Sequence, residues 1–125
     1  MKKLFMMFFF LISFEVKSQT EEWVLTNIGQ IDGKTIKFYL DINNIKKNGN
    51  FVSITRLDDK FIGNIEIGST KHFLKLDCIN SEFETIKILE FTNNMGKGSY
   101  ENIPIIQRLI PFNKNISPFK ELCNI

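Results

Sequence analysis

The sequence is poor in the residues from which most catalytic and metal sites are built. Its 125 residues include one histidine, His72, and two cysteines, Cys78 and Cys123. His72 has no Asp or Cys at ligand spacing, and zinc sites need three or four protein ligands. Catalysis through His72 would require a hydrogen-bonded carboxylate partner inside a cleft. We therefore predict no metal, no cofactor and no enzymatic activity.

The sequence also lacks an excess of positive charge beyond its first residues. Residues 1–18 contain a basic start, a nearly unbroken run of Leu, Ile, Met and Phe, and a final small residue, which is the layout of a secretory signal peptide. The apolar run is about half of the ~20 residues that cross a bilayer as a helix, so no lasting membrane span is expected after cleavage. These residues hold three lysines and one acid, a net charge of +2, and the whole chain is also +2, so residues 19–125 are formally neutral. Nucleic-acid binding, which depends on excess Lys and Arg, is not expected.

The two cysteines predict one disulfide bond. An exported chain folds outside the cytoplasm, in the periplasm, the medium or at the cell surface, and these compartments are oxidising. A Cys78–Cys123 bond would close a long loop, which the chain-entropy model values at about 4 kcal/mol. The alternative is a pair of buried free thiols.

Alternation of apolar and polar residues predicts an α+β fold, a single antiparallel sheet of about six strands with a short C-terminal helix. Asp32-Gly33 is a strong hairpin signal between the first two strands. Residues 58–70 have no clear period and are expected to form mainly a loop, with Asp58 and Asp59 solvated. Ser117-Pro118 resembles a helix N-cap followed by proline at the first helical position. The six predicted strands are 23–28, 34–41, 51–57, 71–79, 84–92 and 105–112.

A series of short segments runs in order along the chain: Trp23, Phe38-Tyr39-Leu40-Asp41 with Ile45, Asn48-Gly49-Asn50-Phe51-Val52, Leu76-Asp77-Cys78, Glu90-Phe91, Met95-Gly96-Lys97-Gly98, Ile110-Pro111, Ser117, Leu122 and Cys123. Taken together, these segments resemble the surface-adhesin protein E family of small exported bacterial proteins. The resemblance implies one domain over residues 19–125, with a sheet tied to the C-terminal helix by Cys78–Cys123. It also implies a protein that can form homodimers and that binds host extracellular-matrix and serum components.

These observations favour an exported, non-enzymatic binding module whose partner is a protein of the host matrix or of the bacterial envelope. Arg56, Lys60 and Lys71 are the candidate contact residues, because exposed charges near loops commonly take part in recognition. The alternative is a periplasmic inhibitor or envelope accessory protein that acts on a hydrolase. In that case residues 93–102 would form the inserting loop.

Overall fold

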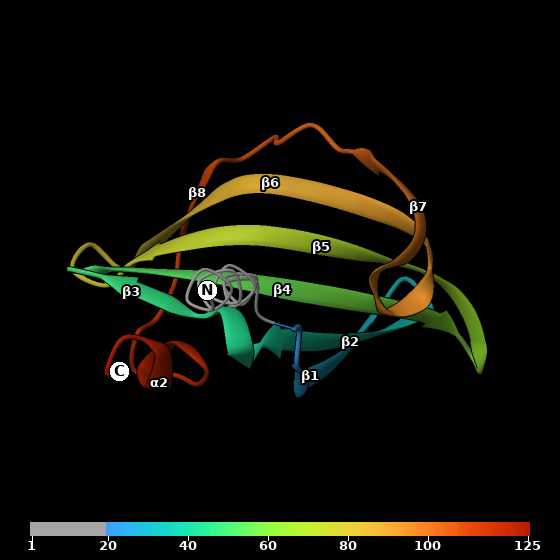
Figure 1. Ribbon diagram of the computed structural model, residues 1–125. Coiled ribbons are helices and arrows are strands. Elements are labelled where there is room, and N and C mark those ends of the chain that lie inside the picture. Colours follow the sequence, from blue (N-terminus) through green and yellow to red (C-terminus); the bar gives the residue numbers. More distant parts are fainter. Residues whose placement is uncertain (1–19) are drawn as a thin grey trace, which may run out of the picture.

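The computed structural model describes residues 20–125, and the expected signal peptide, residues 1–18, lies outside the described residues. The chain forms one curved antiparallel sheet, and a connection after β7 arches along its edge (Figure 1). The strand order is β1-β2-β4-β5-β6-β7, with β3 paired to β4 and β8 paired to β6. Within residues 20–125 no helix is long and apolar enough to cross a membrane. The elements are β1 (Trp23–Ile31), β2 (Lys34–Asp41), η2 (Ile42–Asn44), β3 (Lys46–Asn48), β4 (Phe51–Ile62), β5 (Ile65–Asp77), β6 (Glu82–Asn93), η3 (Asn94–Gly96), β7 (Lys97–Asn102), β8 (Leu109–Pro111) and α2 (Phe119–Leu122).

The described chain has eight strands instead of the predicted six, and it is mostly β in class. The two additional strands are β3 and β7, and every residue in both is exposed. Because neither strand buries a face, neither shows the alternation by which a strand is recognised in sequence. The predicted strand 105–112 shortens to β8.

The expected loop at residues 58–70 is wrong, because β4 and β5 run through it as a long hairpin that turns after Ile62. Asp58 and Asp59, expected in solvent, are both buried on opposite faces of β4, at 9% and 2% exposure. Two buried acids remove the apolar alternation that would have marked a strand. The Asp32-Gly33 hairpin is confirmed, with φ of 50° and 79° as its turn requires.

Different elements cover the two faces of the sheet. One face, here called the inner face, packs against α2 at one end through an apolar core. Phe83, Phe112 and Phe119 extend this core with ring centroids 4.5–6.5 Å apart. The buried members of the core are Leu40, Val52, Ile54, Leu74, Leu76 and Leu122.

The predicted disulfide is confirmed, and it holds α2 to the end of β5. Cys78 and Cys123 are bonded with an S–S distance of 2.01 Å across a sequence separation of 45 residues. The expected N-cap is wrong by one residue, since Pro118 occupies that position. The Ser117 hydroxyl instead donates to the Glu121 carboxylate at 2.9 Å.

The other face, here called the outer face, is covered at one end by η3. Asp59 accepts a hydrogen bond from the Met95 N–H at 2.8 Å, and the Gly96 N–H donates to the Ser69 hydroxyl at 2.8 Å. Asn94 accepts from the Gly68 N–H at 2.8 Å. Burial raises the pKa of Asp59 above its ordinary value, and the charge of Glu66 adds to this, while the Met95 hydrogen bond opposes it.

Candidate functional site

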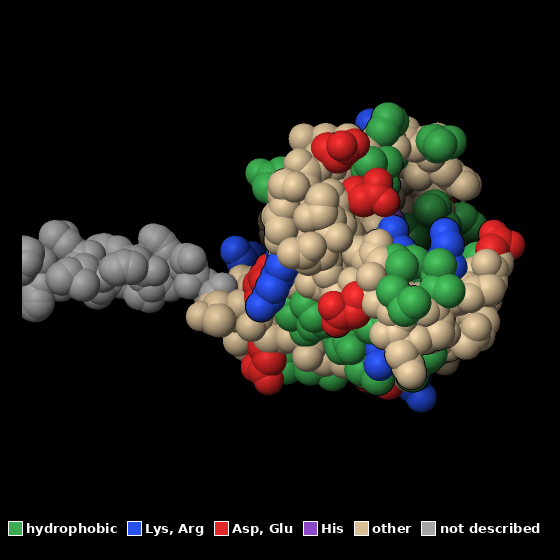
Figure 2. All heavy atoms as spheres, turned by 90° about the vertical axis from the view of Figure 1, so that its right-hand side faces the viewer, with side chains coloured by type: hydrophobic (Ala, Val, Ile, Leu, Met, Phe, Trp, Pro, Cys, Tyr) green, Lys and Arg blue, Asp and Glu red, His purple; other side chains and the backbone are tan. Residues whose placement is uncertain are grey.

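The inner face contains a cavity of about 590 Å³ beyond the part that α2 covers. β4 and β5 form its floor, and the segment 103–107 together with β2 and β6 forms its walls. The end of the molecule is hollowed, with hydrophobic and basic side chains around the hollow (Figure 2). The walls are largely isoleucine, contributed by Ile31, Ile36, Ile88, Ile103, Ile105 and Ile110.

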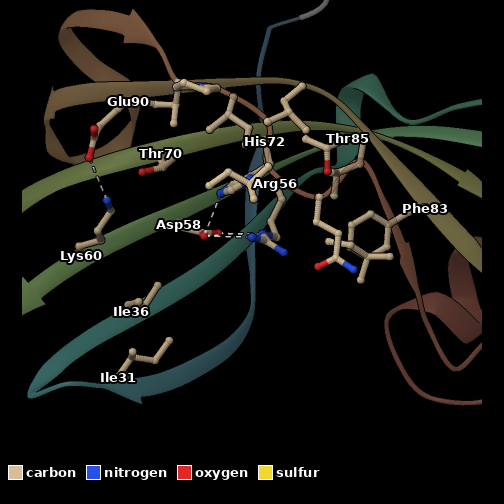
Figure 3. A pocket seen from close by; sticks show the side chains of 18 of the residues that line it. Ile31, Ile36, Arg56, Asp58, Lys60, Thr70, His72, Phe83, Thr85 and Glu90 are labelled. Carbon is tan, nitrogen blue, oxygen red and sulfur yellow. Dashed lines mark hydrogen bonds and ion pairs between the residues drawn. The ribbon is translucent and has the colours of Figure 1, made fainter.

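The cavity floor carries a charged cluster centred on Asp58 (Figure 3). Arg56 donates to it through Nε at 2.8 Å and Nη2 at 3.0 Å, one bond to each carboxylate oxygen. Nε2 of His72 lies 3.1 Å from Oδ2 of the same carboxylate. Burial alone would raise the pKa of Asp58, but the His72 hydrogen bond and the Arg56 charge together hold it below its ordinary value. The cluster is therefore a carboxylate held in its charged form by two donors.

Strand pairing explains why this cluster escaped the sequence analysis. His72 lies opposite Arg56 on the neighbouring strand, and Asp58 lies two residues along β4 on the same face. Diagonal neighbours of this kind are within reach of long side chains. The register that pairs Arg56 with His72 depends on how far β4 and β5 extend toward their turn. Residues 58–70 show no strand pattern, so this register could not be predicted from the sequence.

The cluster meets part of the condition for catalysis through His72, because a carboxylate does orient the imidazole inside a cavity. Arg56 also donates a hydrogen bond to this carboxylate, so Asp58 accepts from both Arg56 and His72. The hydroxyl groups of the cavity wall belong to Thr70 and Thr85, and over the described residues the wall holds no serine or cysteine nucleophile. In residues 20–125, no three His, Cys, Asp or Glu side chains come together as a metal site would need.

The outer face carries lysines that lie over aromatic rings. Lys75 is 4.5 Å from the centroid of Phe51, and Lys87 is 5.0 Å from that of Phe73. Register places Phe73 opposite Lys87 on β6, with Lys75 two residues further along β5. These four residues, here called the outer strip, form an exposed or half-buried patch beyond η3. Cation–π contact favours this position of each ammonium group.

Lys71 lies on the same face, nearer to η3. Its ammonium group is 2.6 Å from the Glu21 carboxylate and lies over the rings of Trp23 and Phe91 at 5.5 and 5.3 Å. This contact ties the start of the described chain to the middle of the sheet.

The three predicted contact residues therefore divide between the faces. Arg56 and Lys60 line the inner cavity, where Lys60 pairs loosely with Glu90 at 3.5 Å. Lys71 lies on the outer face, because its position in β5 alternates with that of His72. The structure thus brings two of the three residues into one site.

Residues 93–102 do not form a projecting loop. The first part is η3, which is pinned to the outer face by the hydrogen bonds of Asp59, Ser69 and Asn94, and the rest is β7, paired with β6. Tyr100 packs against Phe91 at a centroid distance of 5.3 Å. The segment lacks the free reach that an inserting loop needs.

Comparison with known proteins identifies the family to which the chain is similar. A family model described as surface-adhesin protein E matches residues 23–107 of the chain. The matched range includes β1 to β7 and Cys78, while β8, α2 and Cys123 follow it. No curated protein sequence gives a significant match.

Proposed function

Since the chain belongs to the surface-adhesin protein E family, we propose that it is an exported, non-enzymatic module that binds an extracellular or envelope macromolecule. The outer strip of Phe51, Phe73, Lys75 and Lys87 is the proposed contact surface. Lys71 extends it toward η3. A partner with acidic groups beside apolar groups would complement it.

The observation that supports this assignment is the pairing of lysine with aromatic rings on the part of the outer face that η3 leaves uncovered among the described residues. Aromatic side chains provide apolar contact area with little loss of conformational freedom on binding. Ammonium groups that lie above the rings offer positive charge beside the apolar contact area. Within residues 20–125 the inner face offers no comparable flat surface, because α2 covers one end of it and the cavity takes up the other.

Export is supported by the disulfide, which forms readily in oxidising compartments, and by the signal-peptide pattern of residues 1–18. The non-enzymatic assignment is supported by the shared use of Asp58 by Arg56 and His72. It also rests on the family, which is one of surface adhesins.

A homodimer is proposed through β1. This strand ends the order of the sheet and pairs with β2 among the described strands. Val24, Leu25, Ile28 and Ile31 are between 40% and 57% exposed along it. A long apolar edge strand is a template for pairing with a second chain. Size-exclusion chromatography with light scattering, on native protein and on Ile28→Lys, measures whether the mass of a dimer is present and is lost.

A binding experiment with charge-matched variants tests the proposed contact surface. Native protein and Lys75→Glu/Lys87→Glu are compared on immobilised extracellular-matrix extract and on cell-envelope fractions by biolayer interferometry. The control is Lys97→Glu/Lys120→Glu, which changes two exposed lysines elsewhere by the same total charge.

The outer-strip variant is expected to bind at least tenfold more weakly, and the control to bind like native protein, because charge reversal at a contact also adds repulsion. Equal binding by both variants would remove the outer strip from the contact. Failure of correctly folded native protein to bind either preparation would count against adhesion itself.

A further inference from the structure

The inner cavity has an apolar entrance that the proposed macromolecular contact does not use. At its mouth, Ile106 is 97% exposed and Ile31 is 52% exposed. Its volume of about 590 Å³ falls within the range of roughly 300–1,000 Å³ usual for small-molecule sites. Isoleucines from three parts of the chain surround a polar floor, so a fitting ligand has a hydrocarbon part and a polar end.

The floor has spare hydrogen-bond donors and few spare acceptors. The Asp58 carboxylate already accepts from Arg56 and His72. Arg56 uses Nε and Nη2 for these bonds, and a guanidinium carries five N–H donors, so those of Nη1 are not used for Asp58. The hydroxyls of Thr70 and Thr85 also line the cavity. A ligand that supplies acceptor oxygens matches this surplus.

The formal charges of the lining limit how much charge the ligand carries. Three basic and three acidic residues balance, so the cavity is not a strongly positive funnel of the kind that gathers polyanions. A singly charged group next to Arg56 suits this balance better than a phosphate ester or a polyanion does. The charged lining residues are Lys34, Arg56 and Lys60, with Asp32, Asp58 and Glu90.

We propose that the inner cavity binds an amphipathic monocarboxylate, with its hydrocarbon chain among the isoleucines and its carboxylate at Arg56. The ligand class is that of a fatty acid with an unbranched chain. Arginine suits the role because its planar guanidinium can hold Asp58 and still present donors to a second carboxylate. This site is separate from the outer strip, which lies on the opposite face of the same strands.

Lys60 has a secondary role at this site. It is four residues from Arg56 along β4, about 13 Å between Cα atoms at a strand rise of ~3.3 Å per residue. Its ammonium group is 3.5 Å from Glu90. Lys60→Met is expected to weaken binding less than Arg56→Met does.

Equilibrium dialysis of the purified protein with radiolabelled dodecanoate tests the proposal. Dodecanol offers the chain without the charge, and acetate offers the charge without the chain. Dodecanoate is expected to bind with a stoichiometry of one per chain, dodecanol at least tenfold more weakly, and acetate not measurably. Arg56→Met is expected to weaken dodecanoate binding about tenfold or more, since hydrogen bonds to charged groups are the stronger ones. Lys120→Met, in α2, is the control and is expected to bind like native protein.

A second variant covers the case in which Arg56→Met fails to fold. Ile106→Glu changes a side chain that is 97% exposed, so it leaves packing intact and places a charge beside the hydrocarbon chain at the mouth. It is expected to weaken dodecanoate binding and dodecanol binding several-fold each. Dodecanoate binding that is absent, that equals dodecanol binding, or that persists unchanged in folded Arg56→Met or in Ile106→Glu would overturn the proposal.

Discussion

Asp58 and Asp59 provide the sharpest test of the energetics, because the same substitution at two adjacent buried acids is expected to have effects of different size at pH 7 and of opposite pH dependence. Asp58→Asn removes a charge that holds Arg56 and His72 on the inner face. Asp59→Asn removes a charge from the outer face but keeps an oxygen that can accept from the Met95 N–H. The two variants control for each other, because both replace a buried aspartate of β4 by asparagine.

The magnitude follows from the exposure of the partners. Breaking a fully buried ion pair costs about 3–5 kcal/mol, and an exposed pair contributes at most about 1 kcal/mol. The side chains of Asp58, Arg56 and His72 are 13%, 31% and 19% exposed, between these limits. Asp58→Asn is therefore expected to lower the free energy of unfolding by about 2 kcal/mol at pH 7, and Asp59→Asn to change it by no more than about 1 kcal/mol.

The dependence on pH separates the two acids further. The pKa of Asp58 is lowered in the folded state, so its contribution is full above the unfolded value near ~3.9 and disappears as the pH falls through the folded value. The pKa of Asp59 is raised, so its contribution is present below ~3.9 and is lost as the pH rises through the folded value. As the pH falls, the difference in free energy of unfolding between native protein and Asp58→Asn should therefore shrink. Over the same range, native protein should become more stable relative to Asp59→Asn.

Urea denaturation followed by circular dichroism at pH 7, 5 and 3 measures both effects. Retained far-UV spectra would show that each variant folds. The reasoning fails if Asp58→Asn costs no more than Asp59→Asn at pH 7, or if both differences from native protein change in the same direction with pH.

Two further predictions concern covalent and backbone constraints. Replacing Cys78 and Cys123 by Ser is expected to lower the free energy of unfolding by about 4 kcal/mol for a separation of 45 residues, and a loss below about 1 kcal/mol in urea denaturation would contradict this. Gly68→Ala is expected to cost more than Gly63→Ala in thermal unfolding, because Gly68 has a φ of 120° and a Cβ there would lie 3.0 Å from the Phe91 carbonyl oxygen, whereas nothing lies within 4 Å at Gly63. Equal costs would show that the carbonyl moves away freely.

Local patterns in the sequence determined the central strands and the turn between the first two. Residues 34–41 alternate in sequence, and β2 forms there with Leu40 of the apolar set buried in the core. Asp32-Gly33 adopts the positive φ values its turn type suggests. The disulfide followed from having two cysteines in a chain with a predicted export signal. The family could also be named from the sequence, because its marks are short segments in a fixed order along the chain.

Tertiary structure alone decided the sites. The length of the β4–β5 hairpin was hidden because Asp58 and Asp59 are buried acids, and their environments come from residues on other strands. Arg56, Asp58 and His72 meet because strand register places them on one face, and Lys71 alternates to the other. Exposed strands such as β3 and β7 are held by backbone pairing, to which side-chain patterns give no guide. Sequence thus specified which segments bury a face, and only pairing between distant segments specified which charges share a cavity.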